Sequence, residues 1–222
     1  FGQMPVPQYP EFVSLTLDLR DELHPVLANL PDGVSEYTFG GLFLFRKHYD
    51  YQVSRIGDRQ YALSGKRDGR SFFCLPTGLP ADSACLRDLL DKHDYLKGLA
   101  ERFADDARVR LESHGYGIVE DRDNFDYLYR IDDLADLPGR KYHKKRNQVN
   151  GFVRAYEYEH RELSRENCGD AAQVLEHWKQ ERERNGEDEG DDPEALEALE
   201  LMEALQLRGS IVYVDDTPVA YT

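Results

Sequence analysis

The sequence contains few cysteines, no long hydrophobic run and a deficit of positive charge. Its three cysteines, Cys74, Cys85 and Cys168, fall into no C-x-x-C or Cys/His spacing, so we expect neither a disulfide framework nor a metal site. No segment approaches the roughly 18 consecutive apolar residues of a membrane span. The first residues, FGQMPVPQYP, lack the basic flank and apolar core of a signal peptide. We therefore expect a cytoplasmic protein without a transmembrane segment.

Motifs of several enzyme classes are missing as well. The chain has no G-x-S-x-G, no H-E-x-x-H and no G-x-x-x-x-G-K-[ST], and its seven histidines are scattered. Its formal net charge of −15 repels phosphate polymers at long range, which argues against general nucleic-acid binding. The sequence therefore predicts no cofactor.

The first half of the chain alternates between helical and strand-like patterns. With 40% hydrophobic residues in 222, the chain can build packed cores. Hydrophobic period and turn signals predict the order strand, helix, helix, three strands, helix. The expected elements are a strand at 12–17, helices at 18–29 and 35–49, strands at 51–56, 59–65 and 70–76, and one long helix from 82 to 103.

The second half repeats the start of that order. A strand at 155–163 and a helix at 171–184 precede a helix that Asp192 caps, Pro193 begins and Gly209 follows, and a hairpin then turns across 215–217. We interpret this as two copies of one α+β unit, residues 1–115 and 116–222, the second lacking its last elements. Coincidence is the alternative, because α/β domains reuse few patterns. A strand-like DYLYRI lies between the two.

A basic segment, GRKYHKKRNQVNGFVR at 139–154, carries six Lys and Arg residues and no carboxylate. On a helical wheel Tyr142, Val149 and Val153 form one stripe, which we expect to pack. Cationic and amide side chains border that stripe, where partial desolvation strengthens contacts to phosphate or carboxylate. The candidate anion-binding residues are Lys141, His143, Lys145, Arg146, Asn147 and Asn150. In the alternative interpretation, Arg146 pairs internally with Asp123, Asp126, Asp132 or Asp133.

Several stretches resemble a family of bacterial proteins related to the C-terminal catalytic domain of phosphatidylglycerol lysyltransferase. They are DRDNFDYLY, LPGRKYHKKRNQVNGF, the helix beginning EALEAL and the final GSIVYVDDTPVAYT, and the earlier SEYTFGGLFLFRKHYDYQV is similar to that family's N-terminal part. The most specific piece is His143 to Asn147 with Asn150 and Phe152. Gly41 and Phe45 depart from the Asn and Trp expected there.

The resemblance implies tandem acyltransferase units of the GNAT-like fold, each a mixed, mostly antiparallel sheet flanked by helices. It also implies transfer of an aminoacyl group from aminoacyl-tRNA to a lipid hydroxyl without coenzyme A. The turn LPTGLPADS agrees with this, because its two prolines remove backbone N–H groups that would bind a pyrophosphate.

By the same resemblance, Lys145 and Arg146 contact phosphates of a tRNA acceptor end or a lipid headgroup, and Asn147 and Asn150 orient a carbonyl or hydroxyl. The residues identify no catalytic base and no oxyanion donor. Two alternatives stay open: a non-catalytic scaffold that binds a small anionic ligand or a protein partner, and a transferase that acts on peptide or cell-wall precursor amines.

Overall fold

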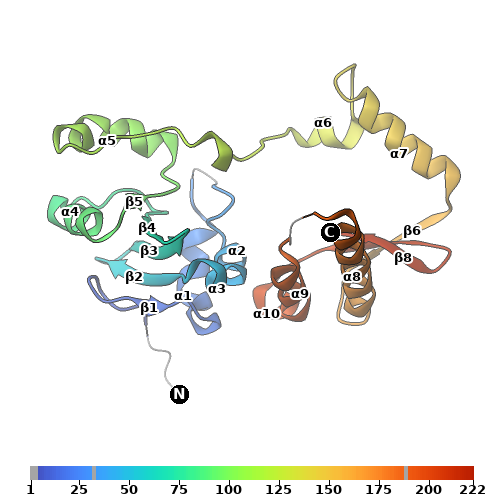
Figure 1. Ribbon diagram of the computed structural model, residues 1–222, viewed down its shortest axis with the longest axis horizontal. Helices are drawn as coiled ribbons and strands as arrows, with labels where there is room; N and C mark the ends of the chain where they lie inside the picture. The colour runs from blue at the N-terminus through green and yellow to red at the C-terminus, as the bar shows by residue number, and fades with distance from the viewer. Residues whose placement is uncertain (1–4, 32–33, 188–189) are drawn as a thin grey trace. The chain divides into compact units, whose positions relative to one another are not determined.

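Two units follow one another along the chain in the computed structural model, which describes residues 5–31, 34–187 and 190–222 (Figure 1). They span Phe1–Asp126 and Tyr127–Thr222. The boundary expected between residues 115 and 116 precedes this division. Tyr116 and Ile118 pack on the core of the first unit, and the Asp126 carboxylate accepts a hydrogen bond of 2.8 Å from the Ser35 amide. These contacts tie the segment 116–126 to the first unit.

The first unit is built on a five-stranded sheet in the order β1-β2-β3-β4-β5. Neighbouring strands are antiparallel except β4 and β5, which are parallel. Asp68 and Gly69 both adopt positive φ, as a two-residue hairpin turn between β3 and β4 requires. The strands are β1 (Val13–Ser14), β2 (Gln52–Ile56), β3 (Gln60–Arg67), β4 (Arg70–Cys74) and β5 (Tyr95–Leu96).

Helices cover both faces of this sheet. Adjacent residues of a strand point to opposite faces, and in β4 both Phe72 and Phe73 are buried. Phe73 joins the buried cluster that includes Leu86 and Leu111, whereas the Phe72 ring lies 6.0 Å from that of Tyr51. The helices are α1 (Arg20–Leu27), α2 (Phe39–Leu44), α3 (Arg46–Tyr49), α4 (Ser83–Lys92) and α5 (Glu101–Ser113), with short 3-10 turns at Leu17–Leu19 and Arg122–Asn124.

The helix start predicted at residue 82 is confirmed by its cap, because the Asp82 carboxylate accepts a hydrogen bond from the Ala84 amide. The helix predicted at 35–49 begins later, at Phe39, where the Thr38 hydroxyl accepts a hydrogen bond from the Gly41 amide, and it breaks at Phe45 into α2 and α3. The single long helix predicted at 82–103 is wrong. Strand β5 separates α4 from α5, and Gly98 then turns the chain with a φ of 66°. The strand expected at 12–17 is shorter and pairs only through Val13–Ser14.

The second unit has a three-stranded antiparallel sheet in the order β6-β7-β8. Its core contains Ala171, Leu199, Met202, Ile211 and Tyr213, so α8, α9 and α10 pack on one face of this sheet. The elements are α6 (Ile131–Asp136), α7 (His143–Ala155), β6 (Tyr158–Glu162), α8 (Cys168–Asn185), α9 (Asp192–Glu200), α10 (Met202–Leu205), β7 (Ser210–Val214) and β8 (Thr217–Tyr221).

The predicted hairpin is confirmed, since Asp215 and Asp216 both turn with positive φ between β7 and β8. The helix predicted from Asp192 to Gly209 breaks at Leu201 and ends at Gln206, whose φ is 55°, and its N-cap is Asp191. The strand predicted at DYLYRI is wrong. Residues 127–130 have no regular secondary structure and pair with no strand in the part of the chain that the structure describes.

The order of elements agrees with the repeat predicted from sequence. In each unit a strand, helices and two strands follow in turn, and the first strand pairs antiparallel with the strand after the helices. The mixed α+β class is therefore confirmed, whereas the tandem GNAT-like duplication stays a prediction. No helix in the described ranges has the length and hydrophobicity needed to cross a membrane.

Candidate anion-binding surface on α7

The basic segment forms helix α7, and Arg146 anchors the turn that precedes it. Leu137 ends α6 with a φ of 46°, and Gly139 continues the turn with a φ of 73°. The Arg146 guanidinium donates to the Leu137 carbonyl and, at 3.3 Å, to the Gly139 carbonyl. Arg146 is half-buried. Its described partners are thus backbone carbonyls of the turn rather than any of the aspartates considered from sequence.

One of those aspartates pairs with a different cation. The Lys141 ammonium lies 2.9 Å from the Asp133 carboxylate, and the Tyr142 hydroxyl donates to the same carboxylate at 3.4 Å. The hydrogen bond to Asp133 raises the pKa of Lys141. Lys141 therefore helps to hold α6 against the start of α7, although its side chain stays exposed.

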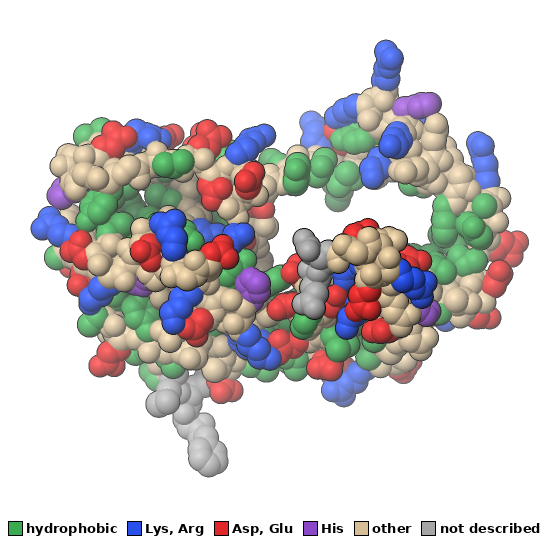
Figure 2. Space-filling view, viewed as in Figure 1, with side chains coloured by type: hydrophobic (Ala, Val, Ile, Leu, Met, Phe, Trp, Pro, Cys, Tyr) green, Lys and Arg blue, Asp and Glu red, His purple; other side chains and the backbone are tan. Residues whose placement is uncertain are grey.

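The remaining candidates lie on the surface of α7. His143, Lys145, Asn147 and Asn150 are exposed, and no described residue makes an ion pair or side-chain hydrogen bond with them. Figure 2 shows Lys and Arg side chains, with a His, gathered over the position of α7. Lys144, which the sequence interpretation left out, is equally exposed and stands three residues before Asn147, on a neighbouring helical position. Among the described residues these groups are available to an external anion.

The expected packing of the stripe formed by Tyr142, Val149 and Val153 is wrong for the two valines. Val149 is 51% and Val153 48% exposed, and α7 has no buried residue. Phe152, half-buried, packs instead on Tyr156 and Tyr158, with ring centroids 5.2 and 5.4 Å apart. A helical wheel identifies an apolar face but not what covers it. The exposed apolar surface of this part of the second unit also includes Tyr127, Leu128, Tyr129, Ile131 and Leu134.

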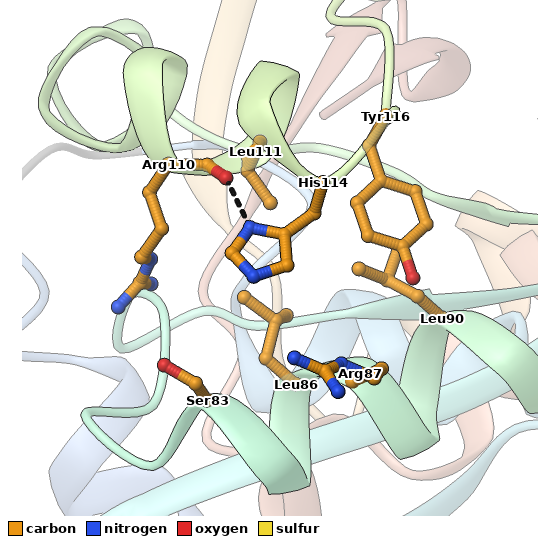
Figure 3. A pocket seen from close by; sticks show the side chains of 8 residues that line it. All are labelled: Ser83, Leu86, Arg87, Leu90, Arg110, Leu111, His114 and Tyr116. Carbon is orange, nitrogen blue, oxygen red and sulfur yellow. Dashed lines mark hydrogen bonds between the residues drawn. The ribbon is translucent and has the colours of Figure 1, made fainter.

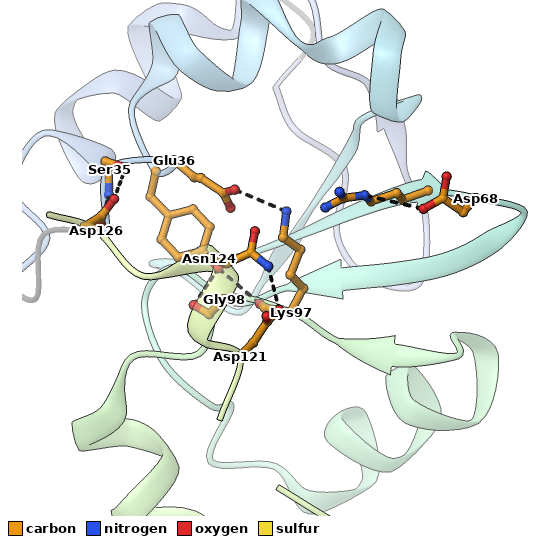
Figure 4. A network of polar contacts seen from close by, with 10 residues as sticks. Ser35, Glu36, Asp68, Lys97, Gly98, Asp121, Asn124 and Asp126 are labelled. Atoms are coloured by element: carbon orange, nitrogen blue, oxygen red, sulfur yellow. Dashed lines mark hydrogen bonds and ion pairs between the residues drawn. The ribbon is translucent and has the colours of Figure 1, made fainter. Parts of the chain in front are cut away.

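An ion pair between a buried lysine and a partly exposed glutamate in the first unit was not predicted from sequence. The side chain of Lys97 is 5% exposed, and its ammonium lies 3.2 Å from the Glu36 carboxylate (Figure 4). The same ammonium is 5.2 Å from the ring centroid of Tyr49 and 5.5 Å from that of Phe72. Glu36 and Lys97 stand 61 positions apart, so no local spacing indicated their contact.

Neutral groups surround this ion pair. The Tyr37 hydroxyl donates to the Gly98 carbonyl at 2.8 Å, and burial raises the pKa of Tyr37 and of Tyr51. Burial also raises the pKa of the Cys74 thiol to about 12. These groups are protonated at neutral pH, and none supplies a thiolate or phenolate nucleophile. In the described ranges no three His, Cys, Asp or Glu side chains are grouped to hold a metal ion.

A family model described as phosphatidylglycerol lysyltransferase, C-terminal, matches residues 27–222. The chain belongs to this family. The match includes helix α7 and strands β2 to β8, so the resemblance inferred from the basic segment is confirmed. Membership in the phosphatidylglycerol lysyltransferase C-terminal family associates the chain with a transferase-related role.

A solved structure has a similar fold. It is a crystal structure of a conserved protein of unknown function from Bacteroides thetaiotaomicron VPI-5482, with 28% sequence identity and a TM-score of 0.80. The similarity covers 95% of this chain and 74% of that chain. No curated protein matches the chain.

Proposed function

We propose that this member of the phosphatidylglycerol lysyltransferase C-terminal family is an aminoacyl transferase that uses an aminoacyl-tRNA-type donor and a phosphatidylglycerol-like lipid acceptor. Helix α7 binds phosphates of the donor acceptor end or of the lipid headgroup. The observation that carries this proposal is the unpaired cationic surface of α7 in a chain of net charge −15.

The electrostatics of the chain favour a local contact over general polyanion binding. The whole molecule repels a phosphate polymer, but the segment 139–154 contains no carboxylate to neutralise its lysines. Lys144 and Lys145 each add a charge at a phosphate, and release of counterions makes such binding salt-dependent. Affinity for tRNA should therefore be modest, and it should fall steeply as the salt concentration rises.

The six predicted residues divide among three tasks in this proposal. Arg146 and Lys141 fix the turn before α7, as their contacts with the turn carbonyls and with Asp133 indicate. Lys145 binds phosphate together with Lys144. The amides of Asn147 and Asn150, with His143, share neighbouring helical positions and orient the aminoacyl ester or the acceptor hydroxyl.

The transfer step follows from the chemistry of the two substrates. The acceptor hydroxyl oxygen attacks the ester carbonyl carbon, the bond to the tRNA ribose oxygen breaks, and a proton passes from the acceptor to the departing ribose hydroxyl. One ester replaces another, so no oxidant or further reactant is needed. The repeated element order and the repeated strand pairing support tandem GNAT-like units as the scaffold for this step.

Binding of charged and uncharged tRNA by the complete protein tests the proposal. We expect the Lys144→Gln/Lys145→Gln double variant to reduce the slope of log affinity against log salt by about 1.4–1.8, which corresponds to two lost phosphate contacts. The control is Lys66→Gln/Lys179→Gln, which removes the same charge elsewhere. Arg146→Ala is the poorer test, because it also removes the anchor of the turn.

Two results would contradict the proposal: no tRNA binding by the complete protein, or an equal loss in both double variants. Transfer is then measured with phosphatidylglycerol vesicles and charged tRNA. Labelled amino acid in the lipid fraction supports the lipid acceptor. Binding without any transfer refutes the transferase and leaves an anion-binding scaffold.

A further inference from the structure

A small cleft lies between helices α4 and α5 of the first unit (Figure 3). Its floor is formed by Leu86 and Leu111, which are 4% and 6% exposed and belong to the buried core. The cleft is shallow and open to solvent, and its enclosed volume of about 20 Å³ has room for only a very small ligand. Five polar side chains line it: Ser83, Arg87, Arg110, His114 and Tyr116.

The two arginines of the cleft have no described partner. Neither Arg87 nor Arg110 forms an ion pair or a side-chain hydrogen bond with a residue that the structure describes, and the buried Arg110 Nε has no acceptor. Arg108 on the same helix differs, since it lies 3.3 Å from Asp105 and 3.6 Å from Glu112. A buried donor without an acceptor costs free energy, so the position of Arg110 favours an external oxygen ligand.

His114 adds a third group to this arrangement. Its Nδ1 lies 2.7 Å from the Arg110 carbonyl, which can only accept, so Nδ1 donates there and Nε2 of the neutral ring is an acceptor for an O–H group of the ligand, such as that of hydrogen phosphate. In Figure 3 the ring lies above Leu86, with Arg110 and Ser83 on one side and Arg87 and Tyr116 on the other. Polar groups thus converge from several sides on one small volume, and no carboxylate lines it.

We propose that this cleft binds a small phosphate-bearing anion, either inorganic phosphate or the phosphate group of a small ester. Guanidinium groups match phosphate oxygens with paired N–H donors, and donors on opposite sides suit a tetrahedral anion better than a planar carboxylate. The size of the cleft excludes a large cofactor. The site is independent of α7, and either proposal can fail without the other.

Calorimetric titration of the complete protein with sodium phosphate, glycerol phosphate and acetate tests the assignment. We expect phosphate or its ester to bind, and Arg110→Gln to weaken that binding by at least about tenfold, as loss of a charge-assisted contact requires. Arg87→Gln, at an exposed position, should weaken it without disturbing the fold. Arg108→Gln is the matched control on the same helix and should change affinity less than about twofold, because that guanidinium is already paired.

The relative affinities of the three anions identify the ligand. Tighter binding of glycerol phosphate than of phosphate identifies an ester ligand, and the reverse order identifies the free ion. The proposal is overturned if neither binds to the wild-type protein, if acetate binds as tightly, or if Arg108→Gln weakens binding as much as Arg110→Gln. Should Arg110→Gln fail to fold, the comparison between Arg87→Gln and Arg108→Gln gives the same decision.

Discussion

Lys97 is the residue at which burial and charge conflict most strongly in the first unit. Its ammonium is removed from water and compensated by Glu36 and by two aromatic faces. Replacing a buried ion pair with apolar groups is often neutral, whereas removing one partner and its volume is costly. We therefore expect the stability of the first unit to depend more on the volume and packing of the side chain at position 97 than on its charge.

Lys97→Ala should lower the free energy of unfolding by about 2–3 kcal/mol, because it leaves a cavity beside Phe72 and removes the partner of Glu36. The value lies at the low end for buried pairs, since Glu36 is 40% exposed and water replaces part of the contact. Lys97→Met keeps the length of the side chain and should cost less than about 1 kcal/mol. Urea unfolding of both variants at pH 7 measures the difference.

Lys92→Ala is the control, because the side chain of Lys92 is 53% exposed and its ammonium lies 2.7 Å from the partly exposed Asp88 carboxylate. Its loss should change stability by less than about 1 kcal/mol. If Lys97→Ala costs no more than this control, the cluster around Lys97 does not contribute to stability as described.

At the scale of residues, the sequence predicted contacts that are local and missed those that are not. The caps Thr38 and Asp82 bond to amides two or three positions away, and such spacings can be read from a sequence. The partners of Lys97 and the position of Arg87 and Arg110 beside one cleft depend on how helices and strands are placed. Arg146 is intermediate: its helical position was predicted, but its carbonyl partners belong to an irregular turn.

Among the elements, the β3–β4 hairpin shows why one strand position must be glycine. Gly65 is paired directly with Phe72, and a Cβ built on Gly65 would lie 2.6 Å from Cζ of that ring. The ring is fixed from behind, with centroids 6.0 Å from Tyr51 and 5.8 Å from Tyr95. The added carbon can be accommodated only by displacing packed aromatic side chains.

Gly65→Ala should therefore lower the free energy of unfolding by about 1–3 kcal/mol, the usual cost of overpacking. Gly169→Ala is the control, because its Cβ would meet nothing within 4 Å and it lies in helix α8, where alanine is favoured. Thermal and urea unfolding give both values. Equal stability of Gly65→Ala and the wild-type protein would contradict the close approach of the Phe72 ring.

The errors at this scale have physical causes. Apolar residues of α4, β5 and α5 follow one another at intervals that one long helix would also produce, and a two-residue strand leaves no periodic signal. The hairpin turns were predicted correctly because their type depends on the turn residues themselves. The face of α7 with Val149 and Val153 was identified by its spacing, but spacing does not state whether a face is covered.

For the whole molecule, the sequence predicted the mixed α+β class and most of the order of elements, but it missed strand β5 within the helix predicted at 82–103. The placement of the segment 116–126 could not be predicted from the sequence, because it depends on the hydrogen bonds between Ser35 and Asp126 and on the packing of Tyr116 and Ile118. Those long-range contacts assign the segment to the first unit. Among the described residues, those directly after Asp126 belong to neither sheet and are exposed.

Residues 127–129 should be the first site of chymotryptic cleavage in the native protein. Tyr127 is 88%, Leu128 97% and Tyr129 53% exposed, and among the described residues they pair with no strand. An exposed chain without regular secondary structure fits a protease active site without local unfolding, whereas cleavage within β2 to β4 or α8 requires loss of a packed core. Mass spectrometry of a brief digest should identify fragments that end at 127–129, and replacing all three residues with Ser should slow this cleavage. A first cut inside either sheet would contradict the division into two separately packed units.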